Sequence, residues 1–156
     1  MTAETRLRPA RPADAPELAA LAGELGYPST TEQMALRLAA LLPDPAQLVL
    51  VAVAADDRAV GWLHAAVRHQ LDSDDCVEVV GLVVGTAWRS AGVGARLLAG
   101  AEAWTREQGL GLVVLRSNVT RERAHAFYLR QGYERVKASY LFRRRVDGAG
   151  SPPPVT

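Results

Sequence analysis

The stretch from Val77 to Leu98, VEVVGLVVGTAWRSAGVGARLL, predicts an apolar strand that leads through a short turn into a helix. Gly92 and Gly94 lie in the first turn of that helix, and Arg89 stands just before them. Glycine lets a ligand approach the backbone closely, and the unpaired N–H groups of a helix N-terminus attract anions. The stretch therefore indicates a cradle for a phosphate or pyrophosphate group; the alternative is that its small residues only pack a helix against a sheet.

Two common phosphate-binding motifs do not fit this stretch. It lacks the Gly-Lys-Ser/Thr ending of a nucleotide-hydrolysing P-loop and the third glycine of the dinucleotide fingerprint. Gly81, inside the strand, predicts a bulge or a close backbone approach. A bulge would break the strand ladder, so Leu82, Val83 and Val84 are expected to present an open edge that pairs with an extended ligand.

The rest of the chain predicts a mixed α/β fold. Apolar alternation and buried runs predict strands over Thr5–Arg8, Leu48–Ala54, Val60–Val67, Val77–Val84, Leu112–Leu115 and Val136–Phe142. Helices are expected between them, with Asp14, Thr30 and Thr120 as N-caps and with capping-box spacing from Thr30 to Gln33. The order β-α-α-β-β-β-α-β-α-β indicates one domain over residues 1–146 and a disordered, proline-rich tail over residues 147–156.

Composition excludes several classes of protein. The 156 residues are 49% hydrophobic and 22% charged, which is typical of a globular domain, and the net charge of +1 argues against nucleic-acid binding. No apolar run approaches the roughly 18 residues that span a bilayer, and the polar start predicts no signal peptide, so we expect a cytoplasmic protein without membrane contact. The lone Cys76 cannot form an internal disulfide, and no residue spacing predicts a metal site.

The phosphate motif, together with a second motif further along, resembles the Gcn5-related N-acetyltransferase (GNAT) superfamily. Arg89, Gly92 and Gly94 match its Arg/Gln-x-x-Gly-x-Gly/Ala motif, which follows a bulged strand. A helix ending in Phe127-Tyr128 and followed by Gly132-Tyr133 is similar to its later motif. The likeness covers roughly residues 4–143 and is nearest in pattern to the aminoalkylphosphonate N-acetyltransferases.

This sequence departs from the family pattern at two positions of the turn. Thr86 stands where many members have proline, and Ser90 where many have glycine. The second change leaves one flexible position fewer in the phosphate-binding turn, while Gly92 and Gly94 are retained.

The resemblance implies a mostly antiparallel sheet with helices on both faces and direct acetyl transfer from acetyl-CoA to a primary amine of a small molecule in a ternary complex. Tyr128 would then protonate the departing thiolate, with plain helix packing as the alternative. Glu78 would be the general base, directly or through water; the alternative is a solvated strand end that continues the acidic loop Asp72–Asp75. The residues expected to hold acetyl-CoA are Leu82, Val83, Val84, Arg89, Ser90, Ala91, Gly92, Val93, Gly94, Ala95, Asn118 and Tyr128.

Other functions remain open at this point. A protein N-terminus or a lysine side chain is the alternative acceptor, and a non-catalytic acyl-CoA sensor is the alternative class. Residues 25–33 and 64–75 are expected to decide the acceptor, but they contain no motif that identifies it. Family members often form homodimers, and the oligomeric state of this chain stays open.

Overall fold

The central strands of the computed structural model are built from three apolar segments whose buried and half-buried residues alternate in part. The structure describes residues 4–147. Its elements in chain order are β1 (Thr5–Pro9), η1 (Pro12–Asp14), α1 (Ala15–Glu24), α2 (Thr31–Leu41), β2 (Gln47–Ala54), β3 (Ala59–Arg68), β4 (Cys76–Val84), η2 (Thr86–Trp88), α3 (Val93–Glu107), β5 (Val113–Leu115) and α4 (Glu122–Arg130).

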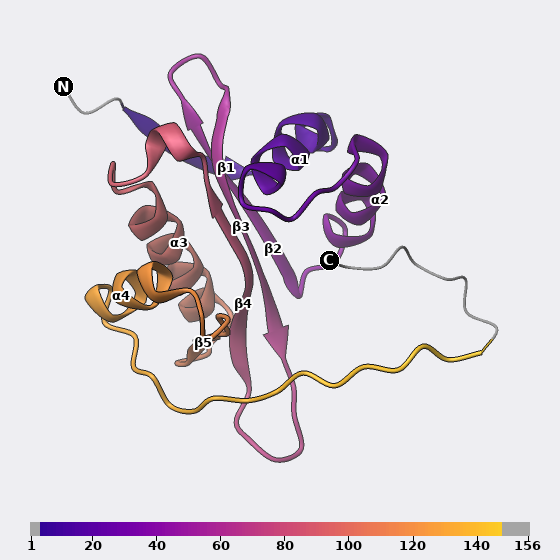
Figure 1. Cartoon of the computed structure of the whole chain (residues 1–156), viewed down its shortest axis with the longest axis vertical. Helices are drawn as coiled ribbons and strands as arrows, with labels where there is room; N and C mark the ends of the chain where they lie inside the picture. Colours follow the sequence, from indigo (N-terminus) through magenta and orange to yellow (C-terminus); the bar gives the residue numbers. More distant parts are fainter. Residues whose placement is uncertain (1–3, 148–156) are drawn as a thin grey trace. The chain divides into compact units, whose positions relative to one another are not determined.

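The five strands form one sheet in the order β1-β2-β3-β4-β5 (Figure 1). Pairing is antiparallel from β1 to β4 and parallel between β4 and β5. This confirms the predicted mixed, mostly antiparallel sheet. The strands expected from apolar alternation differ from β1 to β5 by one residue at most at either end, which is the usual uncertainty of such boundaries.

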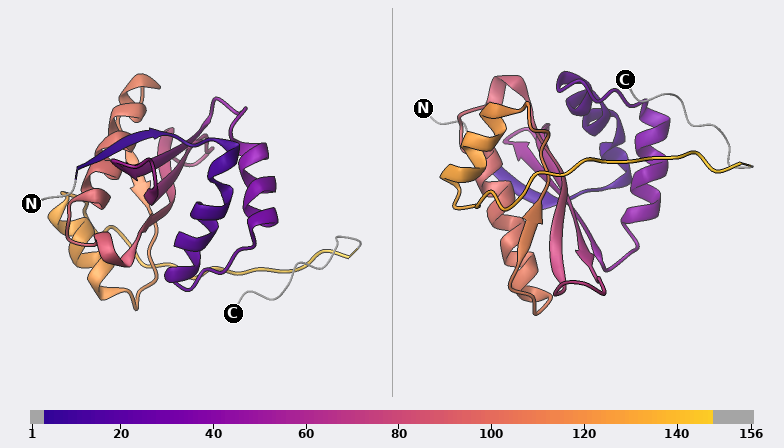
Figure 2. Two further views of the ribbon diagram at one scale, coloured as in Figure 1. Left: turned by 90° about the horizontal axis from the view of Figure 1, so that it is seen from above. Right: turned by 60° about the horizontal axis from the view of Figure 1, so that its bottom comes forward.

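Helices cover both faces of this sheet, as Figure 2 shows most clearly in its left view. α1 and α2 pack on one face, where Leu18 and Leu38 join Val49, Val51 and Val83 in a buried cluster. α3 covers the opposite face with fully buried leucines at positions 97 and 98. Burial of each such side chain contributes roughly 1.5–3 kcal/mol, so the two layers hold β3 and β4 rigidly between them.

The predicted caps of the first two helices have different outcomes. Thr30 accepts a hydrogen bond from the Gln33 N–H at 3.0 Å, and the Gln33 side chain accepts one from the Thr30 N–H, which confirms the capping box. Asp14 does stand at the N-cap of α1, but its carboxylate caps no helix N–H. It forms instead a bidentate pair with Arg8 at 2.8 Å and accepts a hydrogen bond from the Arg11 N–H.

The chain divides into two compact units, Met1–Arg116 and Ser117–Thr156. The first holds the sheet with α1, α2 and α3. The second, described to residue 147, contains α4, whose N-cap is Arg121 rather than the predicted Thr120. A left-handed Gly132, with φ of 92°, follows that helix.

The prediction of a last strand over Val136–Phe142 is wrong. These residues form no strand in the described part of the chain, and the side chains of Val136, Tyr140, Leu141 and Phe142 are about nine-tenths exposed. The apolar residues predicted a strand, but a strand is defined by backbone pairing, which this segment lacks here. The predicted tail lies outside the described residues except for Asp147. Within residues 4–147, no helix is long and apolar enough to cross a bilayer.

Candidate functional site

β4 contains the bulge that the mid-strand glycine predicts. His64 of β3 pairs with Gly81, whereas the next residue, Ala65, pairs with Val79, so Val80 is the extra residue. A side chain at Gly81 would lie 2.9 Å from the Trp62 ring, whose indole N–H donates to the Leu18 carbonyl at 3.2 Å. The glycine therefore lets an aromatic ring pack over the bulge and tie it to α1.

Beyond the bulge, one edge of β4 has no neighbouring strand. β5 pairs with β4 only over Val77–Val79, and within residues 4–147 no strand continues that pairing along the rest of β4. The strands thus separate at Val79, and the backbone from Val80 to Val84 offers hydrogen-bonding groups on the side away from β3. This is the open edge that the sequence predicts at Leu82–Val84.

The glycine-containing turn leads from this edge into α3. Gly92 is the N-cap with φ of 81°, and Ser90 also has a left-handed φ, of 66°. Ser90 thus adopts a conformation that a glycine would adopt with less strain, at the position where many family members have glycine. No side chain caps α3, and its first turn carries no acidic residue. The free N–H groups and the exposed Arg89 beside them suit an anion.

The space around this turn is open. A Cβ added at Gly92 would meet no atom within 4 Å. The start of the turn, by contrast, is fixed: the Gly85 N–H donates to the Val60 carbonyl at 2.8 Å, and the Thr86 N–H donates to the Glu24 carboxylate at 3.3 Å. Glu24 was not predicted as a site residue, because it lies 62 positions away in sequence and only the fold brings it here.

Glu78 lies on β4 at the level where β5 still pairs, opposite Val114. Its side chain is 12% exposed and lies 3.5 Å from both Arg68 and Arg116. The alternative of a solvated strand end is therefore wrong. The carboxylate is instead held between two guanidinium groups at the point where the strands separate.

Cys76 begins β4 and is buried. Burial, followed by the negative charge of Glu78, raises the pKa of its thiol, so it stays protonated at neutral pH. A buried, protonated thiol is poorly suited to act as a nucleophile.

The second unit holds the other two predicted site residues. Asn118 accepts hydrogen bonds at its backbone carbonyl from His125 Nε2, at 2.7 Å, and from the Arg121 N–H. The Tyr128 ring contacts those of Phe127 and Tyr133, with centroids 5.4 and 6.3 Å apart. Tyr128 is half-buried on α4. Glu78, the open edge and the glycine turn thus all belong to the first unit. Asn118 and Tyr128 both belong to the second unit.

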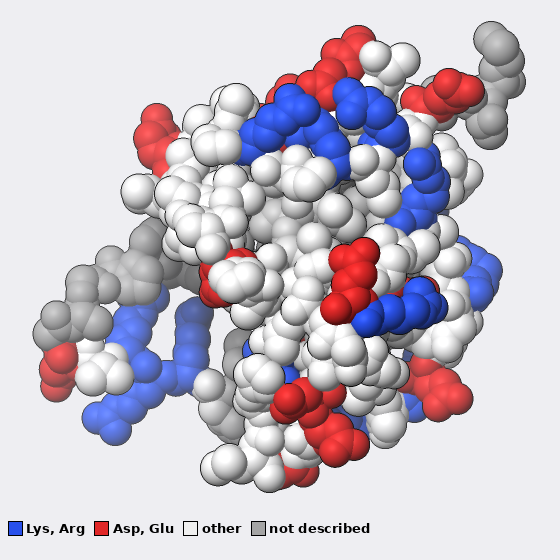
Figure 3. All heavy atoms as spheres, turned by 180° about the vertical axis from the view of Figure 1, so that it is seen from behind, with Lys and Arg blue, Asp and Glu red and all other residues white. Residues whose placement is uncertain are grey.

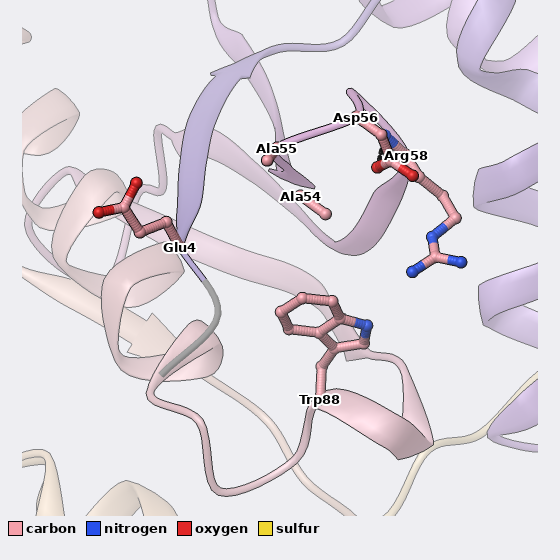
Figure 4. A pocket seen from close by; sticks show the side chains of 6 residues that line it. All are labelled: Glu4, Ala54, Ala55, Asp56, Arg58 and Trp88. Atoms are coloured by element: carbon pink, nitrogen blue, oxygen red, sulfur yellow. Dashed lines mark hydrogen bonds between the residues drawn. The ribbon is translucent and has the colours of Figure 1, made fainter. Parts of the chain in front are cut away.

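A shallow pocket of about 420 Å³ lies beside the β2–β3 turn (Figure 4). Glu4, Ala54, Ala55, Asp56, Arg58 and Trp88 line it. It includes none of the predicted site residues, and it adjoins them only through Trp88, the neighbour of Arg89. The predicted site is an open strand edge rather than a closed cavity. Among the described residues, no group of three or more His, Cys, Asp or Glu side chains could hold a metal ion.

Comparison with known proteins agrees with this geometry. The model of the acetyltransferase (GNAT) family matches residues 15–133. The chain is 33% identical over 145 residues to an aminoglycoside N(6')-acetyltransferase type 1 from Stenotrophomonas maltophilia, covering 90% of this chain and 94% of the relative.

Solved structures with little sequence identity share the fold. An aminoglycoside N-acetyltransferase AAC(6')-Iy in complex with CoA superimposes with a TM-score of 0.83 at 19% identity, covering 94% of this chain and 98% of that one. The AAC(6')-Ih enzyme of Acinetobacter baumannii gives a TM-score of 0.81 at 16% identity, covering 92% and 99%. The chain therefore belongs to the acetyltransferase (GNAT) family, and it is an N-acetyltransferase with acetyl-CoA as its cosubstrate.

Proposed function

We propose that this enzyme transfers the acetyl group of acetyl-CoA directly to a primary amine of a small molecule, in a ternary complex. The observation that carries the proposal is the free edge of β4, which runs from Val84, near the glycine turn, to Val80, two residues from Glu78. An extended ligand can be bound at one end by its phosphates and along its length by backbone pairing, so its far end is placed beside a carboxylate.

The length of the edge supports this arrangement. Four residue steps separate Val84 from Val80, or about 13 Å at roughly 3.3 Å per residue. The pyrophosphate would lie on the N–H groups that open α3, with Arg89 as a countercharge. The pantetheine amides would pair along β4, and the thioester would reach the bulge, two residues from Glu78.

The proposed chemistry forms a C–N bond and breaks a C–S bond. The amine nitrogen attacks the thioester carbonyl carbon and gives a tetrahedral intermediate, which then expels the thiolate of CoA. Glu78 accepts the proton that the nitrogen loses after attack, directly or through water. Tyr128 donates its phenolic proton to the thiolate and recovers one from solvent.

A small-molecule acceptor is supported by the relatives. The most extensive match among them is named for aminoglycosides, and a segment of 57 residues is 44% identical to an aminoalkylphosphonate N-acetyltransferase of Salmonella typhimurium. The net charge of +1 and the mixture of basic and acidic side chains on the surface in Figure 3 fit a small acceptor better than a polyanionic partner.

The test is a thiol-release assay with acetyl-CoA and a panel of amines: aminoglycosides, aminoalkylphosphonates, simple diamines, and a lysine-containing peptide. We expect release with at least one small amine, with the acetylated amine identified by mass spectrometry and with no acetyl-enzyme formed. Acetylation of the peptide alone would overturn the proposed acceptor class, and binding of acetyl-CoA without any transfer would favour the sensor.

A further inference from the structure

His64 is a half-buried titratable side chain on the face of the sheet that α1 and α2 cover, and the proposed chemistry gives it no role. It lies on β3 between Val49 of β2 and Gly81 of β4, directly opposite the glycine of the bulge. Glu78 pairs with Ala66, two residues along β3. Because residues paired across strands project to the same face, the imidazole and the Glu78 carboxylate lie on one face, in adjacent rows.

The His64 ring is held by one neighbour. Its Nε2 lies 2.7 Å from Oε1 of Gln47, so the Nε2–H donates to the amide oxygen. In this tautomer Nδ1 carries the lone pair, and within residues 4–147 it has no hydrogen-bond partner. A base oriented through its second nitrogen by a polar side chain is a recurring arrangement in catalytic sites.

Burial lowers the pKa of His64 below its ordinary value, so the ring is neutral at pH 7. No charged group contributes to this shift. β2 carries no titratable side chain over its length. The titratable groups of the other elements around this face have other partners or are exposed. Glu78 and Arg68 pair with each other, and Arg37 donates a hydrogen bond to Ser29. Glu17 and Glu24 accept backbone hydrogen bonds from Ala59 and Thr86, and Glu32 is exposed.

We propose that Nδ1 of His64 accepts the first proton of the acceptor amine, with Gln47 as the residue that positions the ring. The inference rests on the proposed function. An amine that arrives as an ammonium ion must lose one proton before it attacks the thioester and a second one after the C–N bond has formed. His64 takes the first and becomes an imidazolium, which later releases it to solvent; Glu78 takes the second.

The two groups suit these different tasks. Glu78 lies 3.5 Å from two guanidinium groups at the point where the strands separate, and there it is placed to accept the proton that the nitrogen loses after the C–N bond has formed. His64 is uncharged and half-buried, so it can meet a cation without the cost of desolvating a second charge. The same desolvation makes the bound ammonium ion more acidic, which helps it give up a proton.

The test is the pH dependence of kcat/KM for an accepted amine in His64→Gln, Gln47→Leu and the control Gln108→Leu. Gln108 is an exposed glutamine at the C-cap of α3, outside the proposed site. We expect His64→Gln to lose about 10²-fold or more in kcat/KM for the amine, to keep its KM for acetyl-CoA, and to lose the limb of the pH profile that lies below the ordinary histidine pKa. Gln47→Leu should lose about tenfold in kcat/KM and shift that limb, whereas Gln108→Leu should match the parent enzyme.

Two results would overturn the inference. One is a folded His64→Gln variant with unchanged kcat/KM and an unchanged pH profile in an enzyme that acetylates the amine; this outcome leaves the proposed function intact. The other result would come from nitrogen NMR of the His64 ring in the parent protein, a measurement that needs neither the variant nor turnover. We expect an Nε2-protonated tautomer whose Nδ1 resonance shifts when an amine joins the CoA complex, and an Nδ1-protonated ring or an unshifted resonance contradicts the proposal.

Discussion

Replacing Gly92 by alanine separates ligand contact from backbone strain in the glycine turn. Gly92 has φ of 81°, and a Cβ there would meet no atom of the protein within 4 Å. The added methyl group therefore clashes with nothing in the free enzyme. Its cost to folding is the left-handed conformation alone, about 1–2 kcal/mol for a residue with a Cβ.

Gly109 supplies a matched control. Its φ is 75°, it follows the other end of α3, and its Cβ would also be in open space. Gly109→Ala and Gly92→Ala should thus lower the stability by the same amount, which corresponds to a fall in Tm of roughly 2–8 °C for a chain of this size. Only Gly92→Ala should weaken acetyl-CoA binding, because only its methyl group lies in the turn that we propose as the phosphate cradle.

The assay is calorimetric titration of both folded variants with acetyl-CoA, beside thermal unfolding. We expect at least a tenfold rise in Kd for Gly92→Ala, which is about 1.4 kcal/mol, and no change for Gly109→Ala. An unchanged Kd in Gly92→Ala would refute the cradle. An equal rise in both variants would show that strain spread through α3 causes the loss, not contact with the ligand.

Three further predictions concern other parts of the chain. Tyr128→Phe should lower kcat by about 10²- to 10⁴-fold with little effect on acetyl-CoA affinity, measured by steady-state kinetics against the exposed control Tyr140→Phe; a kcat near that of the parent would return Tyr128 to a packing role. Asp14→Asn should lower the free energy of unfolding at pH 7 by about 3 kcal/mol in urea titrations, because the buried Arg8 then keeps only the more exposed Asp57, at 3.2 Å, as a counterion. Since the Arg8 hydrogen bond lowers the pKa of Asp14, the parent should keep this stability above the ordinary aspartate pKa and lose it at lower pH. The Asp14→Asn variant should not show this fall in stability at low pH, and an equal fall in both proteins would contradict the assignment. Glu24→Ala should raise the KM for acetyl-CoA roughly three- to tenfold at constant kcat, and an unchanged KM would remove its part in fixing the turn.

Local signals in the sequence were enough to predict much of the site. Gly81 inside an apolar strand predicted the bulge, because few other reasons place glycine there. The Thr30 and Gln33 spacing predicted a cap that depends only on residues three apart. The open edge followed from the bulge, and the glycine turn from the order strand, turn, helix.

The rest depends on side-chain partners that only the folded backbone brings together. Asp14 has the position of an N-cap, but the fold brings Arg8 to it and its carboxylate turns away from the helix. The partners of Glu78 come from β3 and from the end of β5, and that of His64 comes from β2, so each is set by strand register. Register cannot be read from one strand by itself.

Amide hydrogen exchange of the enzyme with and without acetyl-CoA locates the bound cosubstrate on the protein. In the proposed complex the cosubstrate lies along the free edge of β4, with its phosphates on the first turn of α3. We predict that binding protects the N–H groups of residues 93–95 and the alternate N–H groups of residues 80–84 that point away from β3. Protection confined to the pocket beside Trp88, or unchanged exchange along β4 at saturating acetyl-CoA, would contradict it.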